Sequence, residues 1–305
     1  MDELPGCPAC ADGRRRPRYR KFGLDLVQCQ GCGLVYANPR LSPEEIWRRY
    51  NPDYFWNEYL PALGVNGGKY DLEIFDARHA AMLRLIEKQV PRRGRLLEIG
   101  AAAGFFLKAA ERAGWDAAGI ELSAEAVKFA RGELKLDVRQ ETAENLTFPP
   151  ASFDAAVMFD VIEHLLDPLL VLRHVRAALK PGAILVVSTP NFNALTRFAL
   201  GLDWAVLSPA EHLFNFSARS LELALRRAGF SPVILERRYE GFGVFETMNP
   251  RYTHAPNAVR TKVYDMLVSK LGWAVYRNVQ RLGLADTLLA LAFRPRDGSA
   301  ARESH

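Results

Sequence analysis

The sequence predicts an α/β fold, in which a doubly wound, mainly parallel, seven-stranded sheet follows a small N-terminal zinc ribbon. Three observations predict it. The only cysteines of the chain lie within its first 32 residues, strand and helix patterns alternate from Arg95 onward, and a turn of glycine and alanine joins the first of these strands to a helix. Strands that alternate with helices of this length build a parallel sheet with helices on both faces.

The composition is that of a folded protein. The 305 residues are 49% hydrophobic and 25% charged, and the mean hydropathy is −0.10. These values exclude collagen-like, disordered and coiled-coil chains. The length suits one large domain with a small appendage. A net charge of +5 permits a phosphate-bearing partner without requiring one.

Neither a membrane-spanning helix nor a signal peptide is predicted. No uninterrupted apolar run reaches the roughly 18 residues that a spanning helix needs. The chain starts with Met1-Asp2-Glu3-Leu4, which is acidic where a signal peptide would be basic and then apolar. We therefore expect a cytoplasmic protein.

The four cysteines form two C-x2-C pairs that are separated by eighteen residues, Cys7 with Cys10 and Cys29 with Cys32. This spacing is typical of a zinc ribbon, in which each pair turns two thiolates toward one ion. Residues 1–42 are therefore predicted to be a ribbon, with a hairpin over Tyr19–Val27. Two disulfides are the alternative, which a reducing cytosol disfavours. Four protein ligands leave no open position, so the zinc is expected to be structural.

Six basic residues lie between the two cysteine pairs. They are Arg14, Arg15, Arg16, Arg18, Arg20 and Lys21. Such a cluster suits a nucleic-acid-binding surface, or it is the solvated tip of the ribbon. No other basic run in the chain supports binding of nucleic acid, which is therefore the less favoured partner.

Residues 43–94 are predicted to form a helical linker that packs on the main domain. A helix begins at Ser42-Pro43, where serine caps the first turn and proline occupies the first helical position. The aromatic stretch from Tyr50 to Tyr59 is expected to pack between ribbon and main domain, and one of its rings could close over a ligand. Apolar residues at helical spacing predict a helix over Asp71–Val90.

The main domain is predicted over residues 95–295. Its strands are expected at Arg95–Ile99, Asp116–Ile120, Leu136–Gln140, Phe153–Phe159, Ala183–Ser188, Val233–Arg237 and Thr287–Phe293, and its helices at Phe105–Ala113, Ala124–Gly132, Pro168–Leu179 and Ala218–Ala228. Two long segments, 189–216 and 239–285, interrupt the alternation, and segments of this length usually cover a functional site. Lys262–Leu284 could instead form a dimer face or lie on a membrane surface. The tail, 296–305, is predicted to be disordered.

The turn after the first strand of the main domain allows a ligand to approach closely. From Gly100 to Gly104 it contains only glycine and alanine, and a helix starts at Phe105. The turn lacks the last glycine of the nicotinamide fingerprint G-x-G-x-x-G. About twenty residues on, Glu121 ends the next strand, where a carboxylate can accept both hydroxyls of a ribose. The alternative for Glu121 is a helix-capping role beside Ser123.

Five blocks of sequence follow one another in a characteristic order. They are Leu97–Gly104, Gly119–Ser123, Glu141–Leu146, Phe153–His164 and Leu179–Ala183. As a set they resemble the motifs of the class I S-adenosylmethionine-dependent methyltransferases, over about residues 70–293. The resemblance implies a Rossmann-like fold, S-adenosylmethionine as cofactor and methyl transfer as reaction. The ribbon, with Gly33–Tyr36 and Asn38-Pro39-Arg40 after it, is similar to the zinc-ribbon subgroup, which is linked to natural-product, sugar and cell-envelope chemistry.

The resemblance implies ten cofactor-binding residues. They are Glu98, Gly100, Ala102, Gly104, Phe105, Glu121, Leu122, Thr142, Ala143 and Asp160. Two of them depart from the family pattern. Ala102 replaces the usual middle glycine, which the backbone tolerates if its φ is negative. Thr142 replaces the usual aspartate of the adenine loop, so the backbone of Ala143 is expected to make that contact.

Methyl transfer to a hydroxyl needs a group that accepts its proton, and histidine suits that task near neutral pH. His164, after the fourth strand of the main domain, and His212, in segment 189–216, lie where the substrate should be. Each could instead hold a loop through hydrogen bonds. Asp160 and Glu163 are alternative bases, or ligands of the methionine end of the cofactor. His79, His174 and His254 are expected to be surface or packing residues.

These observations favour methyl transfer to a small molecule, above all to a hydroxyl of a sugar, natural product or cell-envelope metabolite. The first alternative is an RNA or protein methyltransferase that is guided by the basic ribbon. However, base-amine methyltransferases usually carry Asn/Asp-Pro-Pro-Tyr where this chain has Asp160-Val161-Ile162-Glu163. The second alternative is a binding module on an inactive methyltransferase fold, against which Gly100, Gly104 and Glu121 argue. The acceptor, the choice of oxygen, nitrogen or carbon, and the oligomeric state stay open.

Overall fold

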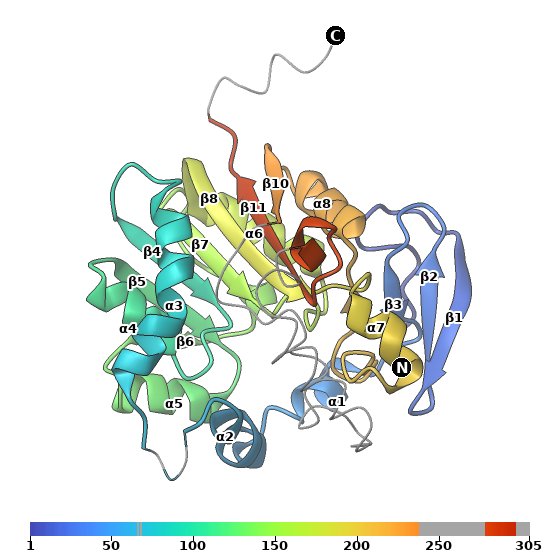
Figure 1. Cartoon of the computed structure of the whole chain (residues 1–305), viewed down its shortest axis with the longest axis horizontal. Helices are drawn as coiled ribbons and strands as arrows, with labels where there is room; N and C mark the ends of the chain where they lie inside the picture. The colour runs from blue at the N-terminus through green and yellow to red at the C-terminus, as the bar shows by residue number, and fades with distance from the viewer. Residues whose placement is uncertain (66, 68, 238–277, 297–305) are drawn as a thin grey trace.

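The computed structural model of the chain describes residues 1–65, 67, 69–237 and 278–296. Within them the strands form two sheets, one of seven strands and one of four (Figure 1). The predicted segments 239–285 and Lys262–Leu284, His254 and the tail 296–305 lie wholly or largely outside the described residues. No helix in the described part of the chain is both long enough and apolar enough to cross a membrane.

The larger sheet confirms the predicted fold class. Its strand order is β10-β11-β8-β7-β4-β5-β6. The strands are β4 (Arg95–Ile99), β5 (Asp116–Glu121), β6 (Asp137–Gln140), β7 (Phe153–Phe159), β8 (Leu179–Pro190), β10 (Val233–Glu236) and β11 (Thr287–Phe293). The pairs from β6 to β8 are parallel, and β11 is antiparallel to both of its neighbours. Strand β8 starts earlier than predicted because Leu179 already pairs with Phe153 of β7.

Helices cover both faces of this sheet, as Figure 1 shows. On one face lie α3 (Leu72–Glu87), α4 (Phe105–Arg112) and α5 (Ala124–Gly132), and on the other lie α6 (Pro168–Ala178) and α8 (Ala218–Arg227). Neighbouring strand residues alternate between the two layers: Leu96 and Val157 join the first, and Leu97 and Met158 join the second. This alternation buries both faces of the strands, as a doubly wound sheet requires.

The winding of the sheet reverses between β4 and β7. From β4 the chain proceeds outward through β5 to β6, and it then returns to place β7 on the other side of β4. The connections at the carboxyl ends of these two strands therefore lead in opposite directions. In doubly wound sheets a crevice opens at such a point, and ligands bind there.

The smaller sheet joins the ribbon to the main domain. Its order is β1-β2-β3-β9, with β1 (Arg15–Lys21), β2 (Leu24–Cys29) and β3 (Val35–Ala37) from the ribbon. Strand β9 (Phe214–Asn215) comes from the predicted covering segment 189–216, which also contains α7 (Leu195–Leu200). The ribbon sheet is therefore completed by a strand of the main domain.

Further contacts hold the ribbon in place. Tyr36 of β3 and Phe214 of β9 are fully buried, with their ring centroids 6.5 Å apart. From α8, the side chains of Arg219 and Arg227 donate hydrogen bonds to backbone carbonyls of the ribbon. Lys21, one of the six basic residues of the ribbon, donates to the backbone oxygen of Trp204 at 3.0 Å. The two sheets therefore share one hydrophobic core.

The linker folds into short helices before α3. Helix α1 (Pro43–Trp47) has the predicted cap, in which Ser42 and Glu45 bond each other's backbone N–H groups. A π-helical segment, Tyr54–Tyr59, leads into α2 (Leu60–Ala62). The aromatic stretch thus lies in one irregular helical segment between ribbon and main domain. Helix α3 is shorter at both ends than the predicted Asp71–Val90: Asp71 is its N-terminal cap and Lys88 its C-terminal cap.

The contact between β9 and the ribbon can be tested with Phe214→Ala. Phe214 is 1% exposed, and removing a buried phenyl ring lowers the free energy of unfolding by about 3–5 kcal/mol. Phe198→Ala is the control, because Phe198 is 60% exposed, and such a surface change alters stability by about 0.5 kcal/mol or less. Urea unfolding measures both. Equal effects of the two substitutions would contradict the shared core.

Candidate functional site

A cavity of about 560 Å³ opens at the carboxyl ends of β4, β5 and β7. It lies where the sheet reverses its winding, the expected position for a ligand. Eleven of the twelve predicted cofactor and catalytic residues line it: Glu98, Gly100, Ala102, Phe105, Glu121, Leu122, Thr142, Ala143, Asp160, His164 and His212. The fold therefore brings together residues that are up to 114 positions apart, from Glu98 to His212.

Gly104 is the one predicted residue that does not line the cavity. It caps α4 with a φ of 83°, and a Cβ atom there would lie 2.6 Å from Leu136 Cδ1. Glycine at 104 therefore suits both the left-handed backbone and the close packing against the segment that follows α5. Gly100 has a φ of 72°, and a Cβ there would lie 2.5 Å from Val161 Cγ2. At both positions a neighbouring side chain already fills the space that the missing Cβ leaves.

Glu121 lies next to the glycine–alanine turn. Its Oε2 accepts a hydrogen bond from the backbone N–H of Ala102, and its Oε1 accepts one from Ser123, both at 2.8 Å. The α5 cap itself is the side chain of Ser123, which accepts from the N–H of Ala126, and Glu121 holds the backbone of that cap residue. This contact does not exclude ribose binding, because each carboxylate oxygen has a second lone pair. The carboxylate ties the turn after β4 to the end of β5.

The expectation of a negative φ at Ala102 is wrong, because its φ is 47°. This left-handed conformation is uncommon for alanine. The backbone N–H of Ala102 donates to the Glu121 carboxylate, and this bond, with the two left-handed glycines of the same turn, holds the conformation. The backbone at position 102 therefore stays left-handed although alanine replaces the usual glycine.

Two buried acids face this end of the cavity with different environments. Burial raises the pKa of Glu98 well above its usual value, and the nearby Glu121 raises it further. Burial also raises the pKa of Glu121, but backbone N–H donors from Ser123, Ala102 and Leu122 oppose that shift. As the pH rises, Glu121 therefore ionises before Glu98.

His164 and His212 meet at the other end of the cavity, with ring centroids 4.6 Å apart. The Nδ1–H of His164 donates to the backbone oxygen of Glu211 at 2.9 Å, and that of His212 donates to the oxygen of Val206 at 2.7 Å. Because a carbonyl only accepts, both protons lie on Nδ1 and both Nε2 atoms carry lone pairs.

Both imidazoles are neutral near neutral pH. Burial, and then the neighbouring His212, lowers the pKa of His164 to about 3. Burial is also the main cause that lowers the pKa of His212. Each ring is thus an acceptor toward the cavity, and the hydrogen bonds foreseen as an alternative role hold the rings in place.

Glu163 adjoins this pair and is 1% exposed. Its Oε2 accepts a hydrogen bond from the hydroxyl of Thr189 at 2.9 Å. Its Oε1 has no hydrogen-bond partner among the described residues and lies 3.9 Å from His164 Nε2. Burial, and then Asp160, raises its pKa. From the sequence, Glu163 was only an alternative base. Its proximity to His212 depends on the tertiary fold, which no local pattern of residues predicts.

Aromatic residues close the rest of the cavity. Its wall includes Tyr50, Tyr54 and Tyr59 from the linker and Phe106 from α4. His79, which the sequence analysis assigned to the surface or to packing, also lines it and stacks against Phe75 with ring centroids 6.4 Å apart. The dense aromatic stretch was the sequence signal for this wall, but nothing in the helical pattern around His79 distinguished it from a core position.

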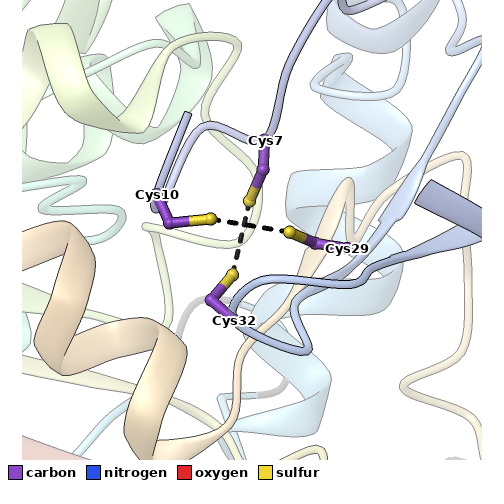
Figure 2. A group of neighbouring side chains, drawn as sticks. All are labelled: Cys7, Cys10, Cys29 and Cys32. Carbon is purple, nitrogen blue, oxygen red and sulfur yellow. Dashed lines mark hydrogen bonds between the residues drawn. The ribbon is translucent and has the colours of Figure 1, made fainter. Parts of the chain in front are cut away.

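The four cysteines form a second cluster, away from the cavity. Figure 2 shows their sulfur atoms converging on one centre. Cys7 Sγ lies 3.4 Å from Cys32 Sγ, and Cys10 Sγ lies 3.5 Å from Cys29 Sγ. A disulfide requires about 2.05 Å, so the disulfide alternative is wrong for this structure, and all four are free thiols. All four sulfur atoms lie within 4.8 Å of one another, which fits the S₄ donor set of a tetrahedral metal site.

Comparison with known proteins identifies relatives of the main domain. The family described as "Methyltransferase domain" matches residues 73–235. The ubiquinone biosynthesis O-methyltransferase of Cereibacter sphaeroides is 32% identical over 194 residues, which are 59% of this chain and 78% of that protein. The enzyme of the same name from Xylella fastidiosa is 34% identical over 167 residues, 50% of this chain and 68% of that protein.

Solved structures share the fold. A methyltransferase from Thermotoga maritima covers 82% of this chain and 99% of its own, with a TM-score of 0.51 and 19% identity. Another methyltransferase, from Archaeoglobus fulgidus, covers 78% of this chain and 99% of its own, with a TM-score of 0.50 and 20% identity. At these identities the likeness shows the fold alone.

Proposed function

The chain belongs to the methyltransferase domain family, and from this premise we propose that it transfers the methyl group of S-adenosylmethionine to a hydroxyl of a small-molecule acceptor. One observation carries the choice of a hydroxyl. Two neutral imidazoles present unprotonated Nε2 atoms in the same cavity as the turn after β4 and Glu121. The two relatives described above are named O-methyltransferases.

The residues around the turn fit the cofactor. The carboxylate of Glu121 suits the ribose hydroxyls, and the loop at Thr142 and Ala143 suits the adenine. Asp160 and Glu98 remain for the methionine end, where the buried Oε2 of Glu98 has no hydrogen-bond partner among the described residues. When bound, S-adenosylmethionine supplies a methyl group that its sulfonium already activates.

At the opposite end, the chain's own residues would bind and activate the acceptor. The Nε2 atoms of His164 and His212 can accept the proton of a hydroxyl that is held between them and the cofactor. The tyrosines and phenylalanines of the wall exclude water and favour an acceptor with an apolar part. The two imidazoles share tautomer and surroundings, and in this proposal both hold the hydroxyl, so the loss of either one slows methyl transfer.

The alternative of an RNA or protein methyltransferase receives less support. Of the six basic ribbon residues, Arg14, Arg15 and Arg20 form ion pairs with acids of the ribbon itself, and Lys21 bonds the main domain. Their charges are thus partly balanced within the protein, which reduces the net field that steers a nucleic acid.

For the ribbon we propose a structural Zn²⁺ held by all four cysteines. Burial and neighbouring thiols raise the pKa of Cys10 to about 11, so without a cation the cluster consists of neutral thiols packed together. Zinc would displace the four thiol protons into solvent and bind the resulting thiolates, offsetting two of their four negative charges. In this proposal residues 1–42 are a ribbon domain whose role is to hold β3 in position for β9.

Loss of the Glu121 carboxylate should weaken cofactor binding. Glu121→Ala removes the acceptor for the ribose, which we expect to raise the Kd for S-adenosylmethionine at least about tenfold, the loss of one or two charged hydrogen bonds. Isothermal titration calorimetry measures it. Glu133→Ala, at an exposed position after α5, is the control. An unchanged Kd for Glu121→Ala would refute the ribose assignment.

The proposed reaction can be tested with S-adenosylmethionine that carries a labelled methyl group. We expect label to appear in phenols, catechols or sugars, and not in amine analogues of the same shape or in RNA. His164→Ala and His212→Ala should lower turnover by about 10²-fold or more, with little change in cofactor affinity. Label only in amines or RNA would exclude the proposed function, and full activity of both variants would remove the imidazoles as bases.

Removing one ribbon ligand should release the zinc. Cys29→Ser is expected to reduce bound zinc, measured by atomic absorption, from one ion per chain to near zero. It should also lower the thermal midpoint, because the ribbon is too small to keep its fold without the metal. Ser208→Ala, far from the cluster in sequence, serves as the control. Full zinc content in Cys29→Ser would contradict a four-cysteine site.

A further inference from the structure

We infer that Glu163, His164 and His212 form a binding site for a divalent transition-metal ion, distinct from the cysteine cluster, in the wall of the cavity. The inference concerns metal binding by this chain and does not require methyl transfer to be correct. It rests on the proposed function only where it describes the acceptor.

The three side chains offer ligand atoms that lie close together. One ligand atom from each lies within 4.8 Å of the others, and Glu163 Oε1 is 3.9 Å from His164 Nε2. An ion with metal–ligand distances of about 2.1 Å holds two ligands up to about 4.2 Å apart. Small side-chain rotations therefore suffice to bring all three atoms onto one ion.

Both imidazoles are oriented in the way that metal-binding histidines usually are. In each ring Nδ1–H donates to a backbone oxygen, that of Glu211 for His164 and that of Val206 for His212. Such a bond fixes the tautomer and presents the Nε2 lone pair as the ligand. The pattern occurs twice, in rings whose centroids are 4.6 Å apart.

The carboxylate of Glu163 gives a second, independent observation that points to a ligand. Thr189 holds Oε2 of Glu163 at 2.9 Å, while Oε1 is buried and has no hydrogen-bond partner among the described residues. A buried polar atom without a partner is costly. A cation between Oε1 and the two imidazoles would remove that cost.

Backbone contacts fix the distance between the two ligand segments. Phe214 lies two residues after His212, and its backbone N–H donates to the carbonyl of Glu163 at 3.1 Å. Phe214 in turn pairs with Tyr36 of the ribbon strand β3. The site is therefore assembled from the loop after β7 and the strand that the ribbon holds.

The donor set indicates the kind of ion. Two imidazoles and one carboxylate suit Mn²⁺, Fe²⁺, Co²⁺ or Zn²⁺, whereas Mg²⁺ and Ca²⁺ prefer oxygen ligands. Three protein ligands leave coordination positions open, in contrast to the four cysteines. Because His164 and His212 line the cavity, an ion bound there could bind a further hydroxyl, and most strongly an acceptor with two neighbouring hydroxyls.

A bound ion would change how the acceptor is activated. A hydroxyl that binds a divalent cation has a lower pKa and releases its proton to solvent more readily. The same lone pair cannot bind both a proton and a metal. In the metal-loaded protein the ion thus replaces the imidazoles as the activating group, while the acceptor's position in the cavity stays the same.

Mn²⁺ is the probe, because thiolate ribbons bind it far more weakly than zinc. The full zinc-loaded chain is titrated with Mn²⁺ without cofactor or acceptor, and the loss of the free-ion signal is followed by electron paramagnetic resonance. We expect one Mn²⁺ per chain. Glu163→Gln and His212→Gln should raise the Kd more than tenfold. His174→Gln, in α6 and outside the cavity lining, should bind as the wild type does.

Thr189→Val keeps all three metal ligands and loses only the hydroxyl that orients Glu163. It should therefore raise the Kd for Mn²⁺ about tenfold. This variant keeps the test decisive if a ligand variant does not fold. Absence of Mn²⁺ binding to the wild type, or wild-type affinity in Glu163→Gln and His212→Gln, would overturn the inference. Methyl transfer without metal binding would leave the proposed function standing alone. Metal binding without methyl transfer would leave only the metal site.

Discussion

The pairing of β3 with β9 is the interaction on which the arrangement of the site depends. Val35 and Tyr36 of the ribbon pair with Asn215 and Phe214, and the backbone N–H of Ala37 donates to the oxygen of Leu213. His212 immediately precedes this strand. Its imidazole lines the cavity beside a strand that pairs with the ribbon, and in our proposal a zinc ion at the four cysteines keeps the ribbon folded. The pairing of the ribbon with β9 thus contributes to the position of a side chain in the cavity.

The cavity separates two kinds of polar group. At one end, Glu121 ties two strand ends together through backbone N–H donors. At the other end, burial keeps two imidazoles neutral beside a carboxylate with one unsatisfied oxygen. The aromatic wall between linker and main domain lowers the local dielectric constant, which strengthens electrostatic interactions at both ends. In the proposed function, the charged cofactor binds beside Glu121 and the polar acceptor beside the two imidazoles.

Most of the fold could be predicted from the sequence, because its signals are local. Alternating strand and helix patterns located all seven strands of the large sheet, and Ser42 with Pro43 marked the start of α1. Local signals failed where the environment decides conformation. Ala102 has a positive φ because of a bond to Glu121, nineteen residues away. The sequence also could not show that Gly104 lies outside the cavity lining, or that His79, which packs on Phe75, also lines the cavity.

The sequence by itself determined the class of sheet, the cysteine spacing of the ribbon and the candidates for the cofactor site, since each follows from periodicity or from residues that are near neighbours in the chain. Only the tertiary structure decided that β9 completes the ribbon sheet and that Glu163, His164 and His212 meet. Those contacts join segments about fifty to one hundred and eighty residues apart. Their formation depends on the summed burial of many side chains, and no local pattern of residues encodes that sum.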